Sequence, residues 1–303
     1  MSAPSYSDLG KNIREVLNAG YKYGKRLVHL NMKNSGENFE IGSNYSMDHS
    51  DSIMHGESIA KLKLRNYGIL SEKWDTDGKL NFRFTYSKLL DGLDLTADIT
   101  YKPSNDMSII KCSANYKNDY INIDGSVSNN LDLKYVKVSA RGVLALKDAL
   151  FGYNVGYDTT SNSLTKSEIG LSYKFPYIGI HFNCSPGFSD NFGVSSVLKV
   201  TDTFQAAITA GCISTTSALN AINGRTYGSF NQIAADWIGS IGGRYQVNDD
   251  TVVRAKVDSN LQLSTSLKLP IAEGVHVTGA FAIALDNPLG GGHKVGLTLD
   301  INA

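Results

Sequence analysis

Cationic side chains at alternate positions are the chemically most informative feature of this chain. They are Lys61, Lys63, Arg65, Lys137, Arg141, Arg254 and Lys256. Successive side chains of a β-strand point to opposite faces, so each group would form a positively charged ladder on one face of a sheet. A ladder that lines a water-filled bore attracts anions and lowers the barrier that they meet there. Asp94, Asp98 and Asp124 occupy similar polar faces, so we expect a modest preference for anions. A solvated sheet with scattered ion pairs is the alternative.

Glu72 is a carboxylate that falls among apolar side chains. It shares one face of an extended segment with Leu70 and Trp74, whereas Ser71 and Lys73 take the other face. An ionisable group in hydrocarbon is costly, which makes Glu72 a candidate functional residue on a lipid-facing surface. The alternative is a position near the rim, among lipid headgroups.

The sequence contains no recognisable arrangement for catalysis. The six histidines lie on separate segments, and none forms a short-spaced metal-binding pair. The chain has no Gly-x-Ser-x-Gly elbow and no Walker loop, and the glycines at 290–292 precede a predicted strand rather than a helix. We therefore expect no enzyme activity, no metal and no cofactor.

The elements that must position these side chains are β-strands. Val295, Leu297, Leu299 and Ile301 alternate with polar residues, and the same period of two recurs in about 19 segments between residues 26 and 302. Segments of about ten residues are long enough for tilted strands to cross the hydrocarbon layer of a membrane. A sheet this large must curl or close. We predict an all-β fold, a transmembrane β-barrel of about 19 strands.

A soluble β-rich binding or structural protein would show the same alternation, because the apolar faces of a sandwich pack against each other. Aromatic residues near the ends of the predicted strands favour the barrel, since aromatic belts mark the two membrane interfaces. These residues are Trp74, Tyr86, Tyr101, Tyr120 and Tyr173.

The N-terminal segment follows a different period. Leu9, Ile13, Val16 and Leu17 form one apolar stripe of a helix that Ser7 or Asp8 can cap and that Gly20 ends. About eleven residues give a length of roughly 16 Å, which is half a bilayer. The helix cannot span a membrane, and we expect it to lie on a membrane surface or to pack inside a pore, with Gly20 and Gly24 as a flexible attachment.

The chain is therefore expected to divide into two parts. Residues 1–25 form the helix and its glycine hinge, and residues 26–303 form the barrel. Residues 213–235 are rich in Ser, Thr, Asn and Gly, which predicts a long loop that could contain a short helix near residues 218–222.

Composition limits the remaining possibilities. Apolar residues make up 42% and charged residues 19% of the 303 residues, which excludes a disordered chain. Basic and acidic residues balance at 29 each, so the overall charge does not indicate a nucleic acid partner. Residues 1–12 lack the pattern of a secretory signal. A barrel made without such a signal points to the outer membrane of an organelle.

Four motifs resemble the voltage-dependent anion channels, the mitochondrial porins. The motifs are Ser7-Asp8-Leu9-Gly10-Lys11 with Arg14, then residues 71–77, 245–257 and 291–297. The resemblance implies a 19-stranded barrel whose first and last strands are parallel, with the helix in the lumen. It also implies a voltage-gated, weakly anion-selective diffusion pore of the mitochondrial outer membrane. Such a pore passes small ions, phosphate, organic anions, ATP and ADP. The protein-import pore of the same membrane is the alternative within this resemblance.

The resemblance also implies roles for single residues. Lys11 and Arg14 match helix positions that contact nucleotides and take part in gating. Gly20 and Gly24 match the hinge, where Lys22 replaces a middle glycine and should stiffen it. Glu72 matches the lipid-facing glutamate that is linked to self-association into homo-oligomers and to docking of a hexokinase-like partner.

Two further regions are implied in the last part of the chain. Leu261, Gln262 and Leu263, together with the segment that ends at Asp286, resemble a region proposed to bind nicotinamide nucleotides such as NADH. The sorting signal of mitochondrial β-barrel proteins is matched by Lys294, Gly296, Leu299 and Ile301. The loop at 213–235 is longer than the family pattern.

Overall fold

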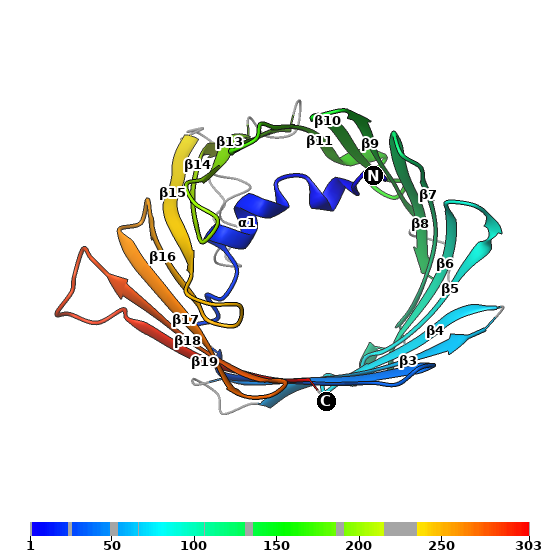
Figure 1. The fold of residues 1–303 in the computed structure, drawn as a ribbon. Coiled ribbons are helices and arrows are strands. Elements are labelled where there is room, and N and C mark those ends of the chain that lie inside the picture. The colour runs from blue at the N-terminus through cyan, green and yellow to red at the C-terminus, as the bar shows by residue number, and fades with distance from the viewer. Residues whose placement is uncertain are drawn as a thin grey trace.

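The described residues form a closed ring of strands with a helix inside it (Figure 1). The computed structural model describes residues 2–23, 26–48, 54–65, 67–105, 107–130, 136–185, 191–214 and 235–302. The strands, in chain order, are β1 Arg26–Ser35, β2 Phe39–Asp48, β3 Met54–Leu64, β4 Gly68–Asp75, β5 Leu80–Leu90, β6 Leu93–Lys102, β7 Met107–Lys117, β8 Ile121–Asn130, β9 Val136–Leu146, β10 Ala149–Asp158, β11 Ser163–Lys174, β12 Ile178–Cys184, β13 Phe192–Lys199, β14 Phe204–Ser214, β15 Ala235–Gln246, β16 Val252–Asp258, β17 Gln262–Ala272, β18 Val275–Ala284 and β19 Lys294–Asn302. The predicted all-β barrel of 19 strands is confirmed.

The barrel closes through one parallel pair of strands. Each strand pairs with its chain neighbours in antiparallel fashion, whereas β1 and β19 run parallel, with Val28 opposite Leu297 and Lys33 opposite Asn302. An odd number of strands in an up-and-down order leaves the first and last strands pointing the same way. Closure therefore requires this parallel pair, and it removes the free edges that an open sheet would expose.

The two faces of the wall differ as the period of two predicted. Phe82 and Phe84 of β5 are exposed on the outside, whereas Arg83 lies between them on the inside with Asp98 of β6. The same holds around the ring, where large apolar side chains are exposed on the outer surface. Apolar area on this scale is typical of a surface that meets lipid.

The buried apolar core lies between the helix and the wall, not between two sheets. Among the described residues the buried cluster consists of Ile13, Val16, Leu17 and Ala207, with Val197 packed against it. A β-sandwich would instead bury the apolar faces of two sheets against each other. The soluble sandwich is therefore excluded as the fold.

The N-terminal segment is a broken helix rather than the continuous one expected. A 3₁₀ turn, η1 Tyr6–Asp8, precedes the α-helix α1 Lys11–Leu17, and Gly10 between them has a left-handed φ of 67°. Ser5, not Ser7 or Asp8, stands before the first turn, and its amide and hydroxyl both donate to Asp8 Oδ2. The predicted apolar stripe is confirmed, because Leu9, Ile13, Val16 and Leu17 are all buried.

Two other segments connect neighbouring strands of the barrel. A second 3₁₀ turn, η2 Pro103–Asn105, follows β6. The predicted loop at 213–235 lies outside the described residues except at its ends, where Ile213 and Ser214 belong to β14 and Ala235 begins β15. In the described part of the chain, no helix has the length and apolar composition needed to cross a membrane.

Candidate functional site

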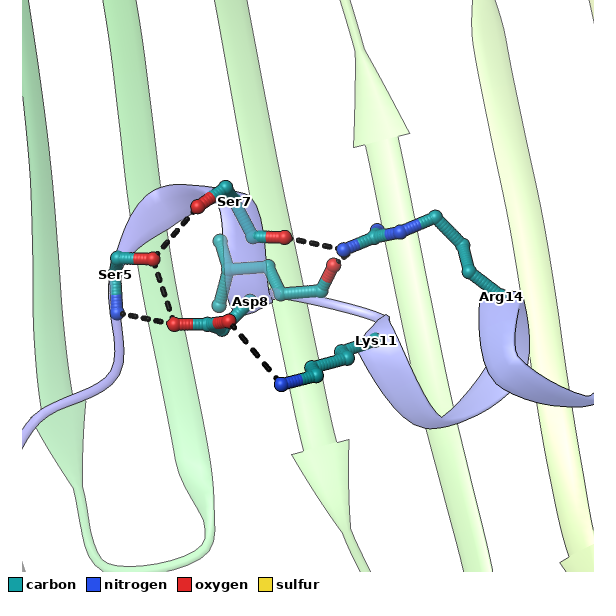
Figure 2. Close-up of polar contacts among 6 residues, drawn as sticks. Ser5, Ser7, Asp8, Lys11 and Arg14 are labelled. Carbon is teal, nitrogen blue, oxygen red and sulfur yellow. Dashed lines mark hydrogen bonds and ion pairs between the residues drawn. The ribbon is translucent and has the colours of Figure 1, made fainter. Parts of the chain in front are cut away.

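The N-terminal segment is fastened to itself by polar contacts (Figure 2). Arg14 donates from its guanidinium to the carbonyl oxygen of Leu9 at 2.6 Å and to that of Ser7. Lys11 Nζ lies 3.9 Å from Asp8 Oδ1, and Ser5 Oγ donates to the other oxygen of Asp8 at 2.6 Å. Arg14 therefore bridges the break at Gly10. Both helix cations named by the sequence, Lys11 and Arg14, are exposed toward the bore but engaged with their own segment.

The wall provides a seat of small residues for the apolar stripe. Gly152 of β10 and Gly170 of β11 lie directly opposite each other, and a Cβ at these positions would be 2.4 Å and 3.0 Å from Leu9 Cδ1. Leu17 Cδ2 lies 3.1 Å from the position of a Cβ on Gly242. These glycines were not predictable from the sequence, because their common role appears only when the register places them beside the N-terminal segment.

The N-terminus is held to the wall beside this seat. The amide of Ala3 donates to the carbonyl oxygen of Asn118 at 2.9 Å, and Asn122 Nδ2 donates to the carbonyl oxygen of Ala3 at 3.2 Å. Burial against the wall, with Glu168 as the second cause, raises the pKa of Tyr6 to about 12. Tyr6 therefore stays neutral. The N-terminal segment runs along the inside of the wall from its first described residues to the end of α1 (Figure 1).

A short linker, residues 20–23, connects the helix to the barrel. Gly20 has a left-handed φ of 84°. Tyr23 shares a hydrogen bond of 2.7 Å with Ser264 Oγ and accepts one from Gln262 Nε2 at 3.2 Å. The linker passes so close to β19 that a Cβ on Gly296 would lie 1.8 Å from the carbonyl oxygen of Lys22. Gly296, expected as part of a sorting signal, thus also gives the linker its path along the wall. Gly24 lies outside the described residues.

Several predicted cations of the bore are neutralised by a carboxylate on the next strand. Lys61 Nζ lies 2.8 Å from Glu40 Oε1 and Lys137 Nζ lies 3.5 Å from Asp158 Oδ2, each pair directly opposed across two strands. Two further pairs are directly opposed, Arg141–Asp124 at 3.7 Å and Arg83–Asp98 at 2.5 Å. Two others, Lys73–Glu57 at 2.5 Å and Lys33–Glu40 at 3.6 Å, join residues that are offset by two positions in the register. Several cations of the predicted ladders therefore stand next to a carboxylate on the neighbouring strand, and the ladders do not form continuous stretches of positive charge.

Two of the predicted cations on β3 differ from Lys61. Lys63 points to the same side as Lys61 and makes no ion pair with a described residue. Arg65 lies beyond the end of β3, in the turn before β4. The expectation that Arg65 continues the strand is therefore wrong by one residue, because β3 ends at Leu64.

The cations on β15 and β16 form a separate group. Arg254 lies opposite Arg244 in the register, and Lys256 is two residues further along the same face. None of these three makes an ion pair with a residue that the structure describes. Lys256 Nζ instead lies 4.9 Å from the centre of the Tyr21 ring, a cation–π contact with the linker. Arg244 was not among the predicted residues, since a single cation in a glycine-rich strand gave no pattern.

Glu72 lies on the outer face of β4. Its register partners are Ala60 and Phe82, and it shares its side of the strand with the exposed Leu70 and Trp74. Trp74 Nε1 donates to Glu72 Oε1 at 2.5 Å. An indole that donates to the carboxylate offsets part of the cost of placing it on an apolar surface.

The structure does not bring the residues of the predicted nucleotide region and of the predicted sorting signal together into one site. Gln262 points inward to the linker and Leu263 takes the other face of β17, whereas Leu261 lies in the turn before that strand. Asp286 is exposed in the connection between β18 and β19. The residues Lys294, Gly296, Leu299 and Ile301 all lie on β19, the strand that closes the barrel. Among the described residues, no group of three or more His, Cys, Asp or Glu side chains could hold a metal ion.

A closed barrel with an apolar outer wall, a charged inner wall and an internal helix defines the class of pore-forming, membrane-embedded β-barrel proteins. Residues 2–296 match the family model described as eukaryotic porin, and the chain belongs to that family. The resemblance inferred from the motifs is thereby confirmed.

Curated relatives match over their full lengths. A protein of Drosophila melanogaster named voltage-dependent anion-selective channel is 28% identical over 305 residues, which covers 100% of both chains. Two others are named non-selective voltage-gated ion channels. VDAC1 of Rattus norvegicus is 29% identical and VDAC2 of Xenopus laevis is 28% identical, each with 99% of both chains covered.

Proposed function

We propose that this protein is a voltage-gated, weakly anion-selective diffusion pore of the mitochondrial outer membrane. It would pass small ions, phosphate, organic anions, ATP and ADP. The observation that supports this function most directly is the closed 19-stranded barrel, whose inner wall bears charges and binds the N-terminal helix. The names of the relatives, which include voltage-gated and anion-selective channels, support the same function.

The arrangement of charge supports a weak preference rather than a strong one. Ion pairs such as Lys61–Glu40 and Arg141–Asp124 contribute almost no net charge to the bore. The excess positive charge comes from cations without an ion pair among the described residues, chiefly Arg244, Arg254 and Lys256. At 0.1 M salt the potential of these three charges decays over about 10 Å into the aqueous bore. The electrostatic barrier that they present to cations therefore stays small.

The N-terminal segment supplies the charge on which voltage would act. Residues 1–25 carry Lys11, Arg14, Lys22 and Lys25 against Asp8 and Glu15. This leaves two net positive charges, and crossing the whole field is worth about 2.3 kcal/mol per charge per 100 mV. A steep voltage dependence would require the wall cations to move as well. Gating would then involve the barrel and its internal segment together, residues 1–25 with residues 26–303.

The outer surface and the last strands carry the proposed partners. Lipid would contact the apolar wall, and Glu72 would serve self-association and the docking of a hexokinase-like protein. Leu261, Gln262, Leu263 and Asp286 would contribute to NADH contact. Insertion into the membrane would use the sorting signal on β19, from Lys294 to Ile301. No catalysis and no nucleic acid partner form part of the proposal.

Reconstitution into a planar bilayer tests the proposal. The purified protein should open stepwise conductances that fall at both voltage polarities. A KCl gradient should give a reversal potential that indicates slightly more chloride than potassium permeation. Failure to conduct would reject the pore. Block by a basic presequence peptide with little ATP flux would instead indicate the protein-import pore.

A further inference from the structure

The joint between the linker and the inner wall concentrates polar side chains. Arg244, Arg254 and Ser266 form one row across β15, β16 and β17, because each lies directly opposite the next in the register. Gly20 covers this row, since a Cβ at Gly20 would be 3.0 Å from both Arg254 Nη1 and Ser266 Oγ. Tyr21 follows in the linker, close enough for the charge of Arg254 to act on its phenol.

Four atoms at this joint are buried without a hydrogen-bond partner among the described residues. They are Arg244 Nε, Arg254 Nε, Tyr21 Oη and Ser266 Oγ. Ser266 is only 3% exposed. Buried polar atoms in native proteins are nearly always paired, so four unpaired ones at a single place indicate a partner outside the chain. The two guanidinium Nε atoms can only donate a hydrogen bond and the two hydroxyls can also donate one, so an acceptor group would satisfy all four atoms.

The charge of the joint has the same sign. Arg244, Arg254 and Lys256 bring three positive charges to adjacent rows of the wall, and Arg244 uses one donor on Gln246 at 3.2 Å. Glu15 of α1 and Asp258 of β16 are the carboxylates whose charges act on Arg254 and Lys256, and in the part of the chain that the structure describes neither forms an ion pair with these cations. Burial raises the pKa of Tyr21 to about 12, so the phenol keeps its proton and remains a donor.

We propose that Arg244, Arg254, Tyr21 and Ser266 form a binding subsite for a phosphate group. Planar guanidinium groups match the tetrahedral oxyanion with paired hydrogen bonds, and hydroxyl donors satisfy its remaining oxygens. The inference deepens the proposed function, because it places the phosphate of a permeating anion at one point of the bore. Tyr21 belongs to the linker and the other three residues belong to the wall. A bound phosphate therefore ties the helix to the barrel.

Calorimetric titration of the full-length protein in detergent with tripolyphosphate tests the subsite. Arg254→Gln should weaken binding about tenfold, the effect of one charge-assisted hydrogen bond. Ser266→Ala, which leaves the charge unchanged, should weaken it about threefold. The matched control is Lys63→Gln, which removes the same charge from β3 across the bore (Figure 1) and should bind like the wild type. ATP should follow tripolyphosphate, and adenosine should not bind.

The results separate the subsite from a diffuse positive field. Equal weakening in Lys63→Gln and Arg254→Gln, with no effect of Ser266→Ala, would overturn the subsite. Binding of adenosine as tight as that of ATP would also overturn it. Planar bilayers distinguish this failure from failure of the pore. A wild type that binds tripolyphosphate without conducting rejects the proposed function alone. A conducting wild type whose binding does not depend on Arg254 rejects the subsite alone.

Discussion

Glycines on the inner face of the wall let the N-terminal segment approach the barrel. Leu9 packs against Gly152 and Gly170, and Leu17 packs against Gly242. The carbonyl oxygen of Lys22 lies against Gly296. Small residues at a contact allow two backbones to approach closely. The side chains of the N-terminal segment that pack against these glycines are then buried from water. The position of the N-terminal segment against the wall is thus determined by where the wall lacks side chains.

Gly152→Val should loosen the seat of Leu9. A Cβ at Gly152 already falls 2.4 Å from Leu9 Cδ1, and such overpacking costs about 1–3 kcal/mol. The matched control is Gly142→Val on β9, because a Cβ there meets nothing within 4 Å. We expect the Gly152 variant in detergent to be cut by trypsin at Lys11 or Arg14 faster than the control. Equal rates of cleavage would show that Leu9 is not held by this seat.

Asp8 makes the N-terminal turn sensitive to acid. Hydrogen bonds from Ser5 are the main cause that holds the pKa of Asp8 below its usual range. A carboxyl with a lowered pKa in the folded state stabilises that state above its unfolded pKa, and the contribution is lost as pH falls through the folded value. The Ser5 amide signal should therefore shift toward its value in the Asp8→Asn variant as the pH drops below about 4. The same signal in Asp8→Asn should stay constant, and a titration that persists in this variant would contradict the assignment.

At the scale of elements, α1 depends on the wall for its existence. A helix of seven residues is not stable by itself in water. It is held by burial of Ile13, Val16 and Leu17 on one side and by the linker contacts of Tyr23 at its end. The helix and its linker should therefore loosen together when either contact is removed.

Tyr23→Phe should weaken the linker. The change removes the hydroxyl that bonds to Ser264, a residue with 0% exposure, and leaves Ser264 Oγ with a long contact of 3.5 Å from Gln262 Nε2. A buried polar group that loses its main partner costs about 1–3 kcal/mol. Thermal unfolding in detergent should therefore shift to lower temperature relative to Tyr177→Phe, where the ring is 70% exposed at the rim. Identical midpoints for the two variants would show that the Tyr23 hydroxyl does not hold the linker.

The helices and strands were predictable from the sequence where a single contrast between two environments determines which residues are apolar. Alternation of apolar and polar residues reflects lipid on one side and water on the other. It predicted the number of strands, and the alternating residues from Val295 to Ile301 lie in β19. The apolar stripe of the N-terminal segment was predictable for the same reason. The break at Gly10 was not, because it depends on Arg14 reaching back to the carbonyls of Leu9 and Ser7.

At the scale of the whole molecule, register determines the electrostatics of the bore. Lys61 is neutralised by Glu40, which is 21 residues away in the chain, because β2 and β3 place them opposite each other. Arg254 has no such partner, because its register neighbours are Arg244 and Ser266. The sequence shows which residues share a face, but it does not show which residue stands opposite on the next strand. Cations were therefore predictable as bore residues, and their pairing was not.

The pairing leads to a prediction about selectivity. Changing Lys61→Gln and Glu40→Gln together removes an ion pair of 2.8 Å without changing the net charge of the wall. The potential of such a pair largely cancels beyond a few ångströms and is further screened by salt. The reversal potential in a KCl gradient should therefore stay at the wild-type value. Changing Lys61, Lys63 and Arg65 together to Glu reverses two charges on β3 and one in the turn that follows it, and this triple variant should shift the reversal potential toward cation preference. A neutral double variant that shifts as far as the triple variant would show that local contacts near Glu40, rather than the net charge of the wall, determine which ions pass.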